Sequence, residues 1–248
     1  MRIKRSLQLW PLNATVHLYW KCHNKEFYLE EANVKDLYME CLEEALKYKD
    51  QYKNCKIHAF CAMGNHFHQS TSYSGGSTYL SNFTRYAHGL FGARYNRKNR
   101  RSGKVAEGRP KTPLIQNTTH EMRVHFYIEA NPIRAGFRTL ENLKSYIYSS
   151  YGFYAYGIKS KFTHLLTIPE WYLALGETPK LRQQNYRKLF KEYLETYSKK
   201  SSIFFKRAFI GDLLWVEKVI QGLKKASASK INSPAALQQL FLIQNDST

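Results

Sequence analysis

Residues 56–73 have the sequence KIHAFCAMGNHFHQSTSY, and this stretch decides the fold class. It divides into two runs, at 56–63 and 66–73, on either side of Gly64 and Asn65. Two such runs joined by a tight turn that contains Gly and Asn are typical of a β-hairpin. The chain is therefore expected to contain an antiparallel pair of strands at this point.

Elements on both sides of the hairpin indicate a mixed α and β domain. Residues 14–22 alternate between an apolar and a polar face, which predicts a half-buried strand. One helix is predicted from a cap at Asn33, and a second over residues 78–96. A third is predicted from a capping box at Thr118 and Glu121 to about Asn131. An extended segment is expected at 102–117. This order predicts an α+β fold with helices on one face of an antiparallel sheet.

The last part of the chain has a different character. Residues 181–197 and 213–223 have the apolar spacing of amphipathic helices, and the tail from Ala226 is rich in Ser and Ala. We therefore expect a first domain over residues 1–137 and a mainly helical C-terminal extension with a loose tail over residues 138–248.

The composition favours a polyanionic partner. The 248 residues include 38 Lys and Arg against 19 Asp and Glu, a formal charge of +19. No stretch approaches the ~18 apolar residues of a membrane-spanning helix, so nucleic acid is a better candidate than a membrane. The four cysteines have no CxxC spacing, which is typical of reduced thiols in a cytoplasmic protein.

Basic residues are concentrated between positions 94 and 111. This segment contains eight basic residues and only one acid, Glu107. A solvated loop would more often mix the two signs, so a surface that contacts phosphates is the better interpretation. The eight residues are Arg94, Arg97, Lys98, Arg100, Arg101, Lys104, Arg109 and Lys111.

His66 and His68 are the first candidates for a metal site. Residues two apart on a strand point to the same side, so both imidazoles can converge on one ion. By itself this spacing is a weak signal, because two nearby histidines are more often surface imidazoles. A structural zinc site that adds Cys61 to the pair is an alternative without a fourth ligand.

Tyr127 and Asn131 are the second candidates. Their spacing places both on one face of the predicted helix, one turn apart. The chain has 19 tyrosines, so any one of them is more often a packing residue than a nucleophile. Asn131 followed by Pro132 is also an ordinary helix end. Spacing alone therefore leaves the role of both residues open.

Several blocks of the sequence together resemble the HUH single-tyrosine transposases. The resemblance is greatest to the branch of REP-associated tyrosine transposases, relatives of the transposases of small bacterial insertion sequences, and it extends over roughly residues 14–220. The blocks are WKCHNKEFYL at 20–29, MGNHFH at 63–68, SGKVAEGRPKTPLIQ at 102–116, FYIEANPIRAG at 126–136, SSYGFYAYG at 149–157, IPEWYLALGETP at 168–179 and FIGDLLWVEKV at 209–219. Pro110 departs from the family, which usually has Phe between the two basic residues at this point.

The resemblance implies a ferredoxin-like sheet and a function. It implies Mg²⁺ or Mn²⁺ at His66 and His68, with Asn131 as a further ligand, and Tyr127 as the nucleophile. The expected activity is cleavage and rejoining of single-stranded DNA, at a hairpin with a short flanking sequence, through a 5′-phosphotyrosine. A monomer and a homodimer both remain open. A non-catalytic protein that binds single-stranded nucleic acid on the same fold is the alternative.

Overall fold

The fold is built around one five-stranded sheet. A computed structural model describes residues 14–50, 54–74, 77–197 and 208–228 of the chain. The strands are β1 (Thr15–Lys21), β2 (Cys55–Ala62), β3 (His66–Tyr73), β4 (Leu114–Ile115) and β5 (Phe209–Ile210), in the spatial order β2-β3-β1-β4-β5. The long strands β2, β3 and β1 pair antiparallel, which confirms the predicted hairpin and places β3 between its two neighbours.

The short strands at the other edge differ from the expected antiparallel pattern. β4 pairs antiparallel with β1, but β5 joins β4 in parallel, so the sheet is mixed. β5 belongs to the C-terminal part of the chain and reaches β4 after a long connection. A connection of that length permits parallel pairing, whereas a tight hairpin does not. The predicted α+β class is confirmed, although the sheet is mixed rather than wholly antiparallel.

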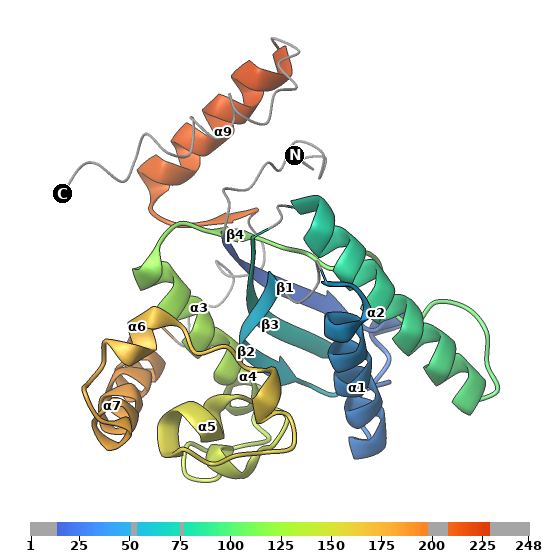
Figure 1. The fold of residues 1–248 in the computed structure, drawn as a ribbon, viewed down its shortest axis with the longest axis horizontal. Coiled ribbons are helices and arrows are strands. Elements are labelled where there is room, and N and C mark those ends of the chain that lie inside the picture. Colours follow the sequence, from blue (N-terminus) through green and yellow to red (C-terminus); the bar gives the residue numbers. More distant parts are fainter. Residues whose placement is uncertain (1–13, 51–53, 75–76, 198–207, 229–248) are drawn as a thin grey trace.

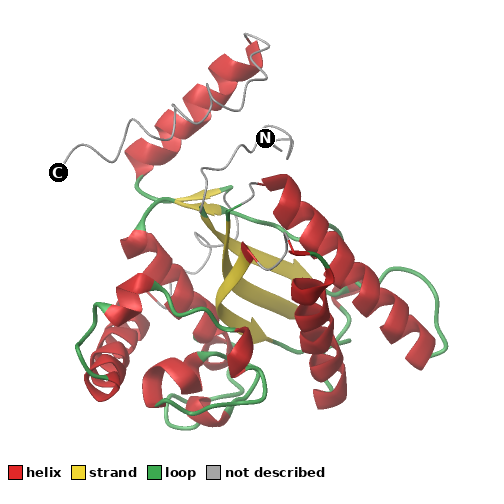
Figure 2. Ribbon diagram, in the orientation of Figure 1, coloured by secondary structure: helices red, strands yellow, loops and turns green. Residues whose placement is uncertain are grey.

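Helices cover both faces of the sheet, as Figures 1 and 2 show. The described helices of four or more residues are α1 (Ala32–Tyr48), α2 (Ser77–Lys98), α3 (Thr118–Glu129), α4 (Asn131–Arg134), α5 (Tyr151–Tyr156), α6 (Glu170–Leu173), α7 (Pro179–Tyr197) and α9 (Leu213–Ala228). On β3, Phe67 packs against Tyr38 of α1, while the next residue, His68, faces Tyr127 of α3. Successive side chains of a strand point to opposite faces, so α1 and α3 lie on opposite sides.

The second covered face explains why β1 differs from its prediction as a half-buried strand. His17 and Tyr19 belong to its polar face, yet their side chains are 0% and 3% exposed. The helical layer that contains α3 covers them. A helix on this face was not expected from the sequence, which predicted helices on one face only.

The start and the end of α3 set the position of the candidate site. The helix is capped by Asn117 rather than Thr118, because the Asn117 side chain accepts a hydrogen bond from the backbone N–H of His120. It ends at Glu129. Pro132 lies in the first turn of α4, where its missing N–H costs no hydrogen bond. The chain therefore continues in a second short helix beyond Asn131.

The cap of α1 also differs from its prediction at Asn33. Glu31 is the residue before the helix, and the helix begins at Ala32. The backbone N–H of the buried residue Leu29 donates to the carbonyl of Gly64, which holds the preceding turn in place. This tertiary contact starts the helix earlier than the side-chain preference of Asn33 would.

The C-terminal part packs along the free edge of β2. The Ala62 N–H donates to the carbonyl of Tyr148 at 2.9 Å, and the Thr167 N–H donates to the carbonyl of Ile57 at 2.7 Å. The division at residue 137 stays a prediction, and the tail beyond residue 228 lies outside the described residues. Within the described ranges, no helix is both long enough and apolar enough to cross a membrane.

Candidate active site

The imidazoles of His66 and His68 lie side by side on the face of β3 that α3 covers. Their ring centroids are 5.0 Å apart, with the rings nearly perpendicular. His68 is buried and His66 is half-buried. In the register with β1, His68 lies opposite Tyr19 and His66 opposite Lys21, so both of these side chains share the face. The two imidazoles therefore lie next to each other on one face of the strand, as their spacing predicted.

The Nδ1 atom of each imidazole has a hydrogen-bond partner. His66 Nδ1 donates to Asn65 Oδ1 at 2.6 Å, which leaves the lone pair of this ring on Nε2. His68 Nδ1 lies 2.8 Å from Nε2 of His17 on β1. When His68 donates this bond, its lone pair is also on Nε2. A partner on the opposite ring nitrogen is the usual support for a metal-binding histidine.

Both imidazoles are held in the neutral form that a metal requires. Burial lowers the pKa of His66 to about 4, and the charges of Lys21 and Arg134 act in the same direction, while a hydrogen bond with Asn131 opposes them. Burial also lowers the pKa of His68 well below its usual value, helped by the neighbouring His17. Neutral imidazoles are available as ligands at physiological pH.

Tyr127 faces this pair from α3. Its ring centroid lies 5.6 Å from that of His68 and 5.4 Å from that of His17, both in edge-on contacts. The side chain is only 2% exposed. Burial raises the pKa of Tyr127, and the positive charge of Arg134 opposes this effect. The phenol is therefore close to the imidazoles and in its neutral form.

Asn131 lies beside His66 and adds an amide group to the candidate donors. Its Nδ2 donates to the backbone carbonyls of Tyr127 and Ile128, at 3.0 and 3.1 Å, so these bonds orient the amide. The amide oxygen is the remaining acceptor, and it lies near enough to His66 to favour the protonated form of that ring. Two imidazole nitrogens and an amide oxygen suit Mn²⁺ well and leave positions open for Mg²⁺ with water or phosphate.

The structure does not support the alternative zinc site. Among the described residues, no group of three or more His, Cys, Asp or Glu side chains could hold a metal ion. The Cys61 thiol is fully buried, with Sγ 3.8 Å from Met63 Sδ. Burial raises the pKa of this thiol well above its usual value, so it stays protonated.

Three residues of the site were not predicted. His17 and Tyr19 lie on the polar face of β1, and the alternation of residues 14–22 already placed them together on one side of a strand. That pattern did not show which element would cover the face. Arg134 lies in α4, with its guanidinium carbon 4.2 Å from the centroid of the Tyr127 ring. Its position depends on the continuation of the chain in helical geometry beyond Pro132.

The eight basic residues between positions 94 and 111 do not form one uniform surface. Arg94 forms an ion pair with Glu44 of α1, with 2.6 Å between Nη2 and Oε2. Arg101 is stacked on the rings of Tyr28 and Tyr95, at 4.6 and 5.6 Å. The side chains of the other six are exposed: Arg97, Lys98, Arg100, Lys104, Arg109 and Lys111.

Lys111 connects this basic segment to the candidate site. Its backbone exchanges two hydrogen bonds with Tyr19 on β1, at 2.9 and 2.8 Å, and its ammonium lies 5.5 Å from the centroid of the Tyr19 ring. Tyr19 in turn contacts the His68 ring at 5.5 Å. The exposed basic segment therefore ends beside the imidazole pair.

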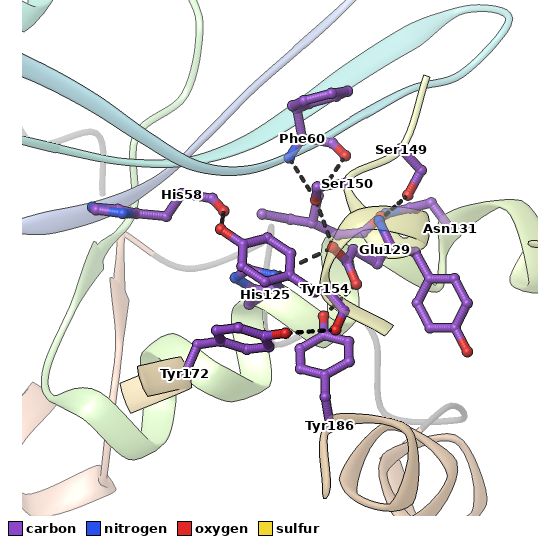
Figure 3. Close-up of polar contacts among 12 residues, drawn as sticks. His58, Phe60, His125, Glu129, Asn131, Ser149, Ser150, Tyr154, Tyr172 and Tyr186 are labelled. Carbon is purple, nitrogen blue, oxygen red and sulfur yellow. Dashed lines mark hydrogen bonds and ion pairs between the residues drawn. The ribbon is translucent and has the colours of Figure 1, made fainter. Parts of the chain in front are cut away.

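A buried carboxylate fastens α3 to the C-terminal extension. Glu129 is 0% exposed and lies between Tyr127 and Asn131 in the chain. It accepts hydrogen bonds from Ser150 Oγ, at 2.5 Å, and from the Tyr186 hydroxyl, and His125 Nε2 lies 3.3 Å away (Figure 3). These partners come from the N-terminus of α5, from α7 and from the preceding turn of α3. The network therefore holds the helix that contains the candidate nucleophile.

The comparisons with known proteins support the fold. No protein-family model matches the chain, and no curated protein matches it. Among solved structures, a REP-associated tyrosine transposase bound to a REP hairpin is similar over 64% of this chain and 87% of its own. The TM-score is 0.50 and the sequence identity is 15%. At this identity, the likeness shows a shared fold.

Proposed function

We propose that the chain is a DNA strand transferase that cleaves and rejoins single-stranded DNA through a covalent bond to Tyr127. One observation supports this most directly: the Tyr127 ring lies 5.6 Å from that of His68, beside a pair of neutral imidazoles. The likeness of fold to a transposase bound to a REP hairpin points to the same class of substrate.

The proposed reaction exchanges one phosphoester for another. The Tyr127 oxygen attacks the phosphorus and loses its proton to water, while the bond between the phosphorus and the 3′ oxygen breaks. That oxygen takes up a proton and leaves as a free 3′-hydroxyl, and the 5′ side stays on the enzyme as a phosphotyrosine. Attack by the 3′-hydroxyl of a strand reverses the step, so rejoining needs no ATP.

The residues around Tyr127 have separate roles in this proposal. His66, His68 and Asn131 would hold Mg²⁺ or Mn²⁺, which polarises a phosphate oxygen and offsets the charge that develops there. His17 and Asn65 orient the imidazoles. Lys111 and the exposed basic residues bind the sugar-phosphate backbone and direct the strand toward the site.

The burial of Tyr127 limits which substrates can react. Because the side chain is 2% exposed, a phosphate reaches the phenol only when neighbouring side chains move apart. A phosphate in a single strand can enter such an opening more easily than one fixed in a duplex. We therefore propose single-stranded DNA next to a hairpin as the substrate.

A crosslinking assay separates this proposal from a protein that only binds nucleic acid. Purified protein is incubated with Mn²⁺ and a set of labelled hairpins with single-stranded flanks, and the products are separated on a denaturing gel. The enzyme leaves a labelled band at the mass of the protein plus DNA, whereas the binding protein leaves none. The double variant His66→Ala and His68→Ala should lose the band and keep its affinity for the DNA.

A further inference from the structure

Arg134 occupies an unusual electrostatic position beside the candidate nucleophile. Its guanidinium lies against the Tyr127 ring, with 4.2 Å between the guanidinium carbon and the ring centroid. Its charge also lowers the pKa of His66, His68 and Tyr193 of α7, so all three are within its electrostatic reach. The guanidinium therefore stacks on one phenol and acts electrostatically on a second phenol and on both imidazoles.

No acid of the described residues neutralises this guanidinium. None of their ion pairs includes Arg134. Its Nη1 is buried and has no hydrogen-bond partner. The guanidinium is hydrogen-bonded to Tyr127, so the unpaired part is the Nη1 donor alone. A buried donor without a partner costs free energy, and one explanation of such a group is a role in binding or catalysis. The stacking on Tyr127 does not supply an acceptor for this N–H group.

We propose that Arg134 is a further catalytic residue, whose guanidinium binds a non-bridging oxygen of the phosphate that Tyr127 attacks. This inference rests on the proposed function and adds a phosphate ligand supplied by the chain itself. The planar guanidinium presents several N–H donors in a fixed arrangement that matches phosphate oxygens. The Nη1 that has no partner is the donor available to the incoming oxygen.

A purely structural role for Arg134 predicts different behaviour. If the side chain only packs against Tyr127, its loss disturbs the fold or the affinity for DNA, and the chemical nature of the phosphate is irrelevant. If the guanidinium binds a phosphate oxygen, its loss matters only while that oxygen has a negative charge. A substrate with an uncharged methyl group in place of one non-bridging oxygen separates the two roles.

The test measures the rate of adduct formation at saturating DNA for wild type, Arg134→Met, Arg134→Lys and the control Arg138→Met. Arg138 also stacks on aromatic rings, those of Phe137 and Tyr146, and lies in the loop after α4. Arg134→Met should slow the reaction roughly 10²–10³-fold, the loss typical of one donor to a developing charge. Arg134→Lys should recover part of the rate, and Arg138→Met should react like wild type.

The same variants are then compared on hairpins with a methylphosphonate at the cleaved position, with each stereoisomer tested separately. For one stereoisomer, Arg134→Met should slow adduct formation by less than about tenfold relative to wild type. An equal loss on the phosphate and on both stereoisomers, or no reaction of either stereoisomer with wild type, would overturn the assignment. Reaction of Arg134→Met at the wild-type rate on phosphate DNA would overturn it too. If wild type forms no adduct at all, the proposed function itself fails.

Discussion

His68 Nδ1 lies 2.8 Å from Nε2 of His17, so an imidazole on the neighbouring strand supports the imidazole that is proposed to bind a metal. His17 is fully buried and also contacts the Tyr127 ring. One residue therefore connects the proposed ligand and the proposed nucleophile.

His17→Ala should weaken the binding of Mn²⁺ about 10–100-fold, the usual cost of losing the partner of a metal-binding histidine. The reason is that His68 loses the acceptor that holds its Nδ1–H and directs Nε2 toward the ion. Isothermal titration of the DNA-free protein with Mn²⁺ measures the change. Wild-type affinity in this variant would show that His17 does not support the site.

The basic residues should contribute unequally to DNA affinity. The triple variant Arg97→Ala, Lys98→Ala and Arg100→Ala removes three exposed charges, so the slope of log Kd against log salt should fall by about 2 for single-stranded DNA. Arg94→Ala is the matched control, because Glu44 already pairs with Arg94. Fluorescence anisotropy at several salt concentrations measures both. Equal changes of slope in the two variants would contradict the distinction between the exposed cations and the paired Arg94.

Glu129→Ala should lower the free energy of unfolding by about 3 kcal/mol or more, because Ser150 and Tyr186 lose a buried acceptor. Tyr186→Phe removes one donor and leaves the carboxylate with Ser150, so its cost should be about 1–2 kcal/mol. Urea unfolding followed by tryptophan fluorescence provides both values. If Glu129→Ala lowers the free energy of unfolding by less than Tyr186→Phe does, Glu129 does not anchor α3 to the extension.

Acid should destabilise the protein through His58. Burial lowers the pKa of His58 to about 4, and its ring donates to the Thr167 carbonyl at 2.9 Å and accepts from Ser72 Oγ at 2.8 Å. The unfolded chain therefore binds the proton first as the pH falls below about 6.5.

The stabilisation that neutral His58 provides is complete above about pH 6.5. This contribution, up to about 3 kcal/mol, is lost as the pH falls to about 4. His58→Phe should flatten this part of the pH dependence of the unfolding free energy, measured by urea titration without metal. An unchanged slope between pH 6.5 and 4 would refute the role of His58.

The features that the sequence predicted well depend on local patterns. The hairpin of β2 and β3 follows from two strand-like runs and the turn at Gly64 and Asn65. The helices α1, α2, α3, α7 and α9 follow from apolar spacing, with errors of a few residues at the ends. The shared face of His66 and His68 follows from strand geometry alone.

The features that the sequence did not predict depend on contacts between distant segments. The parallel strand β5 has two residues and therefore no periodicity to detect. His17 meets His68 only because β1 pairs with β3 in one particular register. The ion pair of Arg94 with Glu44 depends on the packing of α2 against α1, so the segment that looked uniformly basic contains one cation that is already neutralised.

The most direct test of the account identifies the residue that binds DNA covalently. Wild type and Tyr127→Phe are incubated with Mn²⁺ and the hairpin DNA that gives a crosslinked band, digested with nuclease and protease, and examined by mass spectrometry. The account predicts a nucleotide attached through its 5′ phosphate to the peptide that contains Tyr127. It also predicts that Tyr127→Phe binds the DNA with wild-type affinity and forms no adduct. An adduct on another residue, or an adduct of undiminished yield in Tyr127→Phe, would contradict the central claim.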